Sequence, residues 1–100
     1  MPRKNYDEIL AQHLEDSEIA AEYLTAALES GSMDEFLIAL RNVANAHGGI
    51  GALAEITKLN RQSMYKMLSE HGNPTLGSLL PTLKAMGIHL TFSSSKKKAA

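Results

Sequence analysis

The 100-residue sequence contains no cysteine, and no hydrophobic run reaches the roughly eighteen apolar residues that a transmembrane helix needs. Without cysteine the chain has no disulfide framework, no thiolate nucleophile and no cysteine-based zinc site. The first ten residues, MPRKNYDEIL, lack the apolar core of a secretion signal. We therefore expect a cytoplasmic protein with one domain at residues 1–93, and a polar, disordered tail at residues 94–100.

Patterns for catalysis and for metal binding are also missing. The four histidines are far apart, none in H-x-x-x-H spacing, and His13 and His47 fall on apolar stripes where we expect them at the edge of the core. Ser63 has no nearby histidine or acid to activate it. The glycines of residues 48–51 follow a predicted helix and read better as a break than as a phosphate loop. We therefore predict no enzymatic activity, no metal and no other cofactor.

Charge is distributed unevenly along the chain, although the net charge is only −1. Residues 1–35 hold nine acids and two bases, a net charge of −7, and residues 36–100 hold eight bases and two acids, a net charge of +6. A basic segment suits phosphate neutralisation, whereas an acidic segment suits a basic partner. Chance partition of surface charge is the weaker explanation of so large a difference.

Hydrophobic periodicity predicts three helices in the first half of the chain. The first spans Tyr6 to about Glu15, the second is capped by Asp16 or Ser17, and the third ends at Gly48-Gly49. Gly31 suits the position after the second helix, and Ser32 with Glu35 forms a capping box. The predicted apolar faces are Tyr6, Ile9, Leu10, His13 and Leu14; Ile19, Ala20, Tyr23, Leu24, Ala27 and Leu28; and Phe36, Leu37, Leu40, Val43 and Ala44.

The stretch from Gly49 to Glu70 organises the rest of the chain. It contains two short amphipathic segments, whose apolar faces are Leu53 and Ile56 in the first and Met64, Met67 and Leu68 in the second. The break at residues 58–60 is too short for a loop, and it ends in Asn60, a preferred N-cap. The pattern therefore predicts a helix, a tight turn and a second helix.

The predicted outer face of the second helix is polar at Arg61, Gln62, Ser63 and Lys66. In a helix-turn-helix the second helix enters the major groove with its first turn against base edges. Arginine can bond guanine and glutamine can bond adenine, while serine is permissive. We therefore predict a DNA-reading face, with Lys58 and Lys66 as phosphate contacts; a merely solvated helix face is the alternative.

The C-terminal part begins with a turn at residues 71–74. A last helix starts at Thr75 or Ser78 and ends at Gly87, and Pro81 predicts an irregular first turn. Ile88, Leu90 and Phe92 then alternate with polar residues, which predicts a short strand at residues 88–93. A lone strand needs a partner, so we expect a homodimer held partly by these three side chains; addition of the strand to a partner's sheet is the alternative.

Leu53-Ala54, Leu59, the Asn60 cap and Arg61-Gln62-Ser63 together resemble the lambda-repressor-like helix-turn-helix family. Two positions depart, since Lys58 stands where the family usually has a turn glycine and Ile50 where many members have a phosphate-binding glutamine. Residues 6–92 also resemble HigA-like antitoxins, the antidote proteins of HigBA-type addiction modules. The clearest segments are AAEYLTAALESG, FLIALRNVANAHGG, LAEITKLNRQSMYKMLSEHGNPTL and LKAMGIHL.

This resemblance implies a protein that neutralises a cognate toxin, typically a small basic ribonuclease, and represses its own operon by binding operator DNA. The implied fold is an all-α, compact helical bundle, with acidic helices at residues 6–30, a helix-turn-helix core at 32–87 and one short C-terminal strand. A phage-type repressor with no toxin is the alternative. The predicted DNA-binding residues are Lys58, Asn60, Arg61, Gln62, Ser63, Tyr65, Lys66 and Asn73, and the predicted toxin-binding residues are Glu15, Glu18, Glu22 and Glu29.

Overall fold

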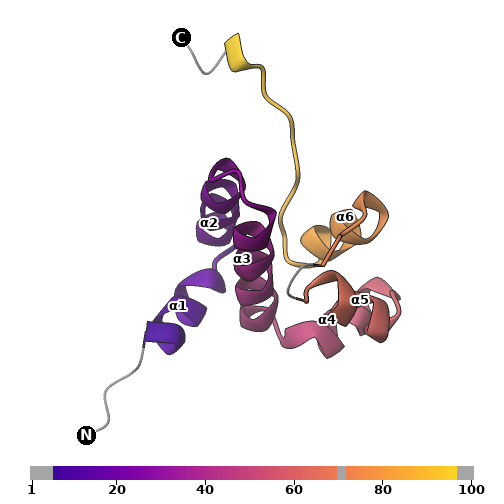
Figure 1. The fold of residues 1–100 in the computed structure, drawn as a ribbon. Coiled ribbons are helices and arrows are strands. Elements are labelled where there is room, and N and C mark those ends of the chain that lie inside the picture. The colour runs from indigo at the N-terminus through magenta and orange to yellow at the C-terminus, as the bar shows by residue number, and fades with distance from the viewer. Residues whose placement is uncertain (1–5, 70–71, 97–100) are drawn as a thin grey trace, which may run out of the picture.

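The computed structural model describes residues 6–69 and 72–96, and within these ranges the chain forms six α-helices and no β-strand (Figure 1). None of these helices is long and apolar enough to cross a membrane. The predicted all-helical class is therefore confirmed. The helices are α1 (Tyr6–Leu14), α2 (Ser17–Glu29), α3 (Met33–Ala46), α4 (Gly49–Thr57), α5 (Arg61–Met67) and α6 (Leu76–Ala85).

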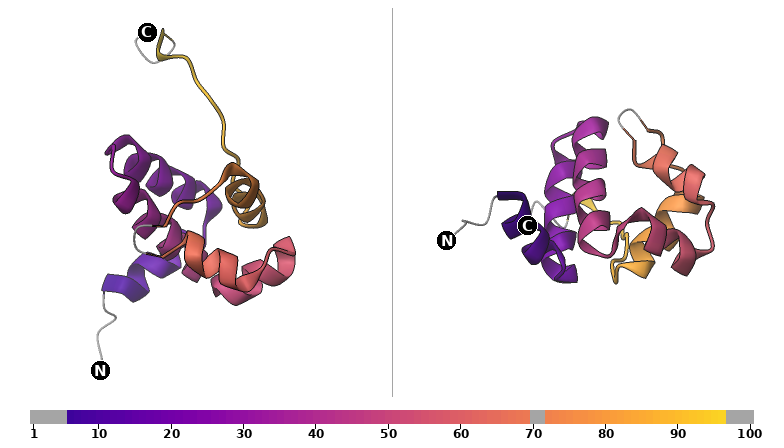
Figure 2. Two further views of the ribbon diagram at one scale, coloured as in Figure 1. Left: turned by 45° about the vertical axis from the view of Figure 1, so that its right-hand side comes forward. Right: turned by 90° about the horizontal axis from the view of Figure 1, so that it is seen from below.

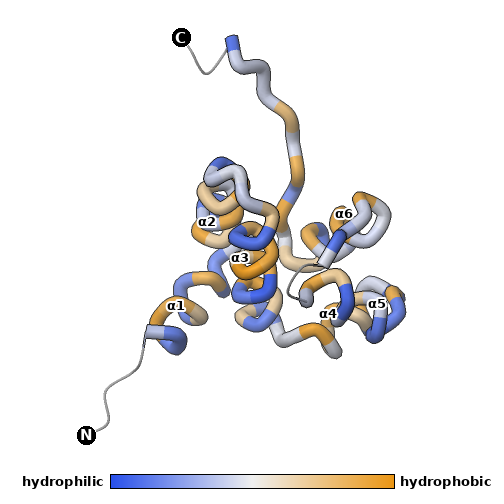
Figure 3. Tube along the Cα trace, in the orientation of Figure 1, coloured by the Kyte–Doolittle hydropathy of each residue, from blue (hydrophilic) through white to orange (hydrophobic). Residues whose placement is uncertain are grey.

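Helix α3 lies at the centre of the molecule, with α1 and α2 on one side and α4, α5 and α6 on the other (Figures 1 and 2). It packs against α1, α2 and α4, and α4 also packs against α5 and α6. Hydrophobic and polar residues alternate along the helices (Figure 3), and Leu40, Val43 and Ala44 of α3 are completely buried. They belong to one hydrophobic core to which all six helices contribute.

Side-chain caps fix the starts of four helices, because the first N–H groups of a helix have no partner within it. Asp16, Ser32, Asn60 and Thr75 all lie in extended backbone and accept such a bond. The predicted caps of α2, α3, α5 and α6 are therefore confirmed. The N–H donors are Glu18 to Asp16 at 2.8 Å, Glu35 to Ser32 at 3.2 Å, Ser63 to Asn60 at 3.0 Å and Ser78 to Thr75 at 3.2 Å.

The irregular first turn predicted for α6 is wrong. The carbonyl of Thr75 accepts the N–H groups of both Ser78, at 3.1 Å, and Leu79, at 2.8 Å, so the helix starts regularly. Pro81 lies inside this helix, where its missing N–H removes the usual donor to the carbonyl of Gly77. Gly77 is exposed, so water can pair with its carbonyl, and the helix continues past the proline.

Several side chains predicted to face the core face solvent instead. In α1 the buried side is set by Leu10 and Leu14, which leaves Tyr6, Ile9 and His13 exposed. In α4 the inner face is formed by Leu53, Ala54 and Thr57, and this register turns Ile56 outward to 63% exposure. Ile19 and Leu28 of α2 are also exposed, at 39% and 51%.

His47 lies at the edge of the core, as predicted. Its side chain is half-buried at the end of α3, and Nε2 lies 2.9 Å from the carbonyl oxygen of Leu14. This contact links the last turn of α1 to the last turn of α3. His13, for which the same position was predicted, is exposed on α1 because only every third or fourth residue of that short helix faces inward.

A second long-range hydrogen bond joins α2 to the end of α6. The hydroxyl of Ser17 donates to the carbonyl oxygen of Met86 at 2.7 Å, across 69 residues of sequence. Gly87 follows with φ of 77°, a conformation that disfavours any residue with a Cβ. A Cβ at this position would also lie 2.9 Å from the Ser17 hydroxyl oxygen. Gly87 therefore allows the chain to turn closely past the start of α2.

The strand predicted at residues 88–93 does not form in the single chain, because no neighbouring segment among the described residues supplies the hydrogen-bond ladder that a strand requires. Ile88 is instead buried in the core, and its N–H donates to the carbonyl of Leu83 at 2.9 Å. Residues 91–96, here called the C-terminal arm, are exposed and lead away from the helices (Figures 1 and 2). Residues 97–100 of the predicted tail lie outside the described range.

Candidate functional site

The turn between α4 and α5 is built on a lysine in the left-handed conformation. Lys58 has φ of 64° and ψ of 15°, the only positive φ of a non-glycine residue in the described part of the chain. The hydroxyl of Thr57 donates to the carbonyl of Leu53 at 2.7 Å and accepts the N–H of Leu59 at 3.3 Å. Leu59 packs against the core. These contacts hold the turn although lysine replaces the glycine that this backbone conformation favours.

We expect Lys58→Gly to raise the free energy of unfolding by about 1 kcal/mol, since the left-handed conformation costs a residue with a Cβ roughly 1–2 kcal/mol. Urea unfolding measures this change. Lys66→Gly is the matched control: it removes the same charge from the middle of α5 and should lower stability by about 1 kcal/mol. A loss of stability in Lys58→Gly would show that the lysine side chain contributes more than the backbone strain costs.

Helix α5 separates an inner apolar face from an outer polar face. Met64 and Met67, with Leu68 just past the helix end, are buried, as predicted. The opposite face is exposed along the whole of this seven-residue helix, and Tyr65 is 54% exposed. All eight predicted DNA-binding residues are exposed: Lys58, Asn60, Arg61, Gln62, Ser63, Tyr65, Lys66 and Asn73.

Arg61 lies back over the start of α4. A Cβ built on Gly51 would lie 3.0 Å from a terminal guanidinium nitrogen of Arg61 and 3.3 Å from Cζ. The absence of a side chain at Gly51 therefore provides the space that the guanidinium occupies. The charge of Arg61 therefore lies between α4 and α5 rather than at the tip of α5.

A cleft of about 400 Å³, lined by both polar and apolar groups, lies beside α5. It brings Ser63 and Lys66 of α5 together with Asn73, three residues predicted from the sequence to bind DNA. The other lining residues, none of them predicted from the sequence to bind DNA, are Met67, Ser69, Gly72, Pro74, Thr75 and Ser78. Hydroxyl groups and amides of this kind are common partners of phosphate oxygens. Glu70 and His71, which belong to the same connection, lie outside the described residues.

The acidic residues gather at the other end of the molecule, on α1 and α2. Glu18, Glu22 and Glu29 are spaced by four and seven residues, which places them on one stripe of α2. Together with Glu15, between α1 and α2, they are exposed. Figure 1 shows α1 and α2 on the opposite side of α3 from α5. The predicted DNA-binding and toxin-binding residues therefore occupy different sides of the molecule.

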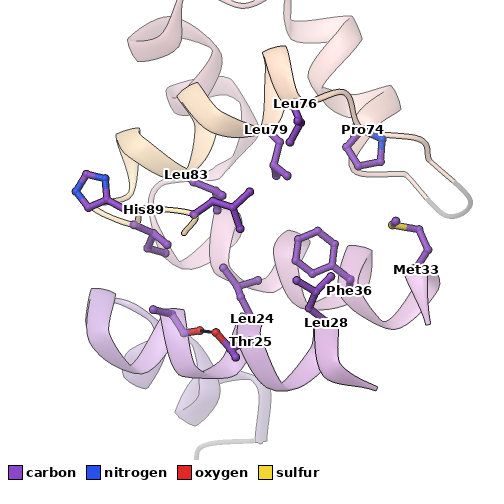
Figure 4. A pocket seen from close by; sticks show the side chains of 13 residues that line it. Leu24, Thr25, Leu28, Met33, Phe36, Pro74, Leu76, Leu79, Leu83 and His89 are labelled. Atoms are coloured by element: carbon purple, nitrogen blue, oxygen red, sulfur yellow. Dashed lines mark hydrogen bonds between the residues drawn. The ribbon is translucent and has the colours of Figure 1, made fainter. Parts of the chain in front are cut away.

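An apolar groove of about 290 Å³ separates α2 and α3 from α6 (Figure 4). Leu24 and Leu28 project into it from α2, Phe36 from α3, and Leu79 and Leu83 from α6. The remaining lining residues are Ala21, Thr25, Met33, Pro74, Leu76, Ile88, His89 and Leu90. None of the described residues forms a group of three His, Asp or Glu side chains that could hold a metal ion.

Comparison with known proteins identifies the family of the chain. The family model of the probable addiction module antidote protein matches residues 4–94. The chain belongs to this family. It is also 29% identical, over 93 residues, to an uncharacterised protein of Haemophilus influenzae, and the match covers 93% of each chain. No solved structure matches the chain significantly.

Family membership implies that this antidote has a cognate toxin as a partner. The acidic surface and the α4–α5 unit are the two places where the predicted binding residues are brought together. Ile88, predicted to hold a dimer, is instead buried within its own chain, whereas Leu90 and Phe92 are 40% and 96% exposed.

Two features of the antidote were missed from the sequence. One is the exposed pair Tyr6 and Ile9 on α1, which the apolar periodicity assigned to the core. The other is the groove of Figure 4, whose walls come from two distant parts of the sequence, within residues 21–36 and 74–90. The sequence signal for this exposure is that six of the nine residues of α1 are apolar or histidine, more than one face of so short a helix can bury.

Proposed function

We propose that this antidote binds and neutralises a small, basic, ribonuclease-type toxin and represses its own operon by binding operator DNA as a homodimer. It acts by binding alone, without catalysis. The observation that carries the proposal is the placement of the two charged surfaces on opposite sides of α3. A chain arranged in this way can hold a basic protein at α1 and α2 while α5 contacts DNA.

The toxin surface combines charge with apolar contact. Glu18, Glu22 and the neighbouring Glu15 supply a field that attracts a basic partner and steers its association. Tyr6 and Ile9, exposed at 74% and 43%, add the apolar area that a specific interface needs. Such a surface suits a small basic protein better than it suits nucleic acid, which the same carboxylates would repel.

The DNA surface is the unit of α4, the turn and α5, used as a helix-turn-helix. Three observations support this use. The first turn of α5 is capped, polar and exposed, the basic residues Lys58 and Lys66 lie near it, and Asn73 lines the cleft beside the same helix. Lysines contribute affinity through phosphates, whereas the first turn of the second helix reads bases. A two-fold dimer would then read a palindrome with half-sites roughly 34 Å apart.

Family membership favours this function over a phage-type repressor that has no toxin. The test is to express the antidote with the product of the reading frame beside its own gene. We expect the two proteins to purify together and RNA cleavage by the partner to fall in proportion to the antidote added. Gln62→Ala should neutralise the partner as well as the unmodified chain. Undiminished RNA cleavage at a molar excess of antidote would refute the toxin-binding part of the proposal.

A further inference from the structure

We propose that the apolar groove between α2, α3 and α6 is the docking site for the C-terminal arm of a second copy of the chain, with Phe92 as the inserted side chain. This inference rests on the homodimer proposed above and specifies how that dimer is held. Each chain carries one groove and one arm, so a single two-fold axis satisfies both grooves at once.

The arm carries an apolar side chain that its own chain leaves in solvent. Phe92 is 96% exposed, the largest exposed fraction among the large hydrophobic side chains of the described residues. Figures 1 and 2 show the arm leading away from α2 and α6 rather than folding over them. An aromatic side chain removes a large apolar area from water when it enters a pocket. Binding of Phe92 in an apolar pocket is therefore strongly favourable in free energy.

The groove offers the matching surface. Leu24, Leu28, Phe36, Leu79 and Leu83 project into its volume of about 290 Å³ (Figure 4). That volume is of the size that accepts one large side chain and part of its neighbours. The groove also opens beside Leu90, the point from which the arm leaves the body, so that arms exchanged about a two-fold axis would cross close to both grooves.

Charge favours a second copy as the occupant. In the sequence the arm reaches Lys96 and is followed by two more lysines, whereas Glu35 is exposed next to the groove-lining Phe36 of α3. The basic end of one copy would therefore meet an acidic side chain at the rim of the other copy's groove. Two arms that run antiparallel across the axis would also give each other the backbone partners that a single chain lacks.

Cysteine cross-linking in the full chain tests the docking directly, because the natural sequence has no cysteine to interfere. Leu28→Cys places a thiol at the groove, where the side chain is 51% exposed and its replacement should be tolerated, and Phe92→Cys places one on the arm. The two single variants are mixed, oxidised mildly and separated without reductant, and the linked peptides are identified by mass. Ile19→Cys, also on α2 but outside the groove, replaces Leu28→Cys as the control.

We expect a covalent dimer that joins positions 28 and 92 in the mixture, and none that joins 19 and 92. A bond formed only within one chain, in the Leu28→Cys/Phe92→Cys double variant, would overturn the proposal by making the chain's own arm the occupant. No bond at all would also overturn it. If the thiol introduced by Leu28→Cys is protected from labelling only when toxin is added, the groove belongs to the toxin instead.

Sedimentation separates this inference from the proposed homodimer. Phe92→Ser should raise the dimer dissociation constant at least tenfold, while Ile56→Ser, a change at another exposed apolar site on α4, should leave it unchanged. A dimer that survives Phe92→Ser and forms no 28–92 bond would contradict the groove docking and leave the homodimer standing. A free protein that sediments as a monomer at every concentration would contradict both.

Discussion

Gln62→Ala is expected to weaken binding to the operator by about 1–3 kcal/mol, roughly 5- to 150-fold, while binding to random DNA changes far less. Gln62 is exposed on the first turn of α5, next to the Asn60 cap, and the buried Met64 fixes the rotation of this turn. A glutamine there can form two hydrogen bonds to one base edge, and a contact with phosphate alone cannot reproduce this bidentate pair. Titration of labelled operator and of a scrambled sequence at one salt concentration measures both affinities.

Arg61→Ala tests the second predicted base contact, and the position of its side chain makes the outcome informative. The guanidinium rests over Gly51, so it must leave that site to reach a base edge. Gly51→Ala is a companion variant that keeps the charge but places a Cβ 3.0 Å from the guanidinium nitrogen and so displaces it. If Arg61 reads a base, Arg61→Ala should lose operator binding selectively and Gly51→Ala should retain it.

Equal losses on operator and random DNA in both Gln62→Ala and Arg61→Ala would rule out base reading at α5. A selective loss for Gln62 alone would leave Arg61 as a phosphate contact made from its place over α4. In that case the salt dependence of binding should also fall by about one counterion in Arg61→Ala.

Reversing Glu18 and Glu22 to lysine is expected to slow association with the toxin by about tenfold or more at low salt. The change replaces an attractive field by a repulsive one on the stripe of α2. Neither side chain belongs to the hydrophobic core, so folding should be preserved, and operator binding should be unchanged or stronger. Stopped-flow mixing at several salt concentrations measures the association rate.

Glu55→Lys is the control for net charge, since Glu55 is exposed on α4, away from α1 and α2. Its reversal should slow toxin association little. If the double variant associates as fast as the unmodified chain, the toxin does not approach through α2. If Glu55→Lys slows association equally, only the overall charge of the antidote matters and the stripe has no special role.

The helices and their ends were predictable because local chemistry decides them. Each of the four caps accepts a hydrogen bond from an N–H group no more than three residues away, so the helix starts do not depend on distant contacts. The caps are Asp16, Ser32, Asn60 and Thr75. The inner face of α5 was predictable for a similar reason. Met64 and Met67 have the spacing of a helix face, and no competing apolar stripe exists on that helix.

Orientation was harder to predict where a short helix carries more apolar residues than it can bury. In α4 both Ile56 and Thr57 were available, and packing against α3 and α6 selected the face with Thr57. In α1 the same choice left Tyr6 and Ile9 exposed and buried Leu14. The groove, and the place of Arg61 over α4, depend on contacts between distant segments. Periodicity within one helix carries no information about either.

The bond between Ser17 and Met86 ties the first residue of α2 to the end of α6, and one core runs through all six helices. A chain of this size with a shared core unfolds as a unit, so neither half can open fully while the other stays closed. A toxin that binds only the folded chain therefore raises the unfolding free energy of α5 as well as that of α2. Proteases cleave the unfolded chain. A partner bound to α2 would therefore slow cleavage in all six helices, including those that it does not contact.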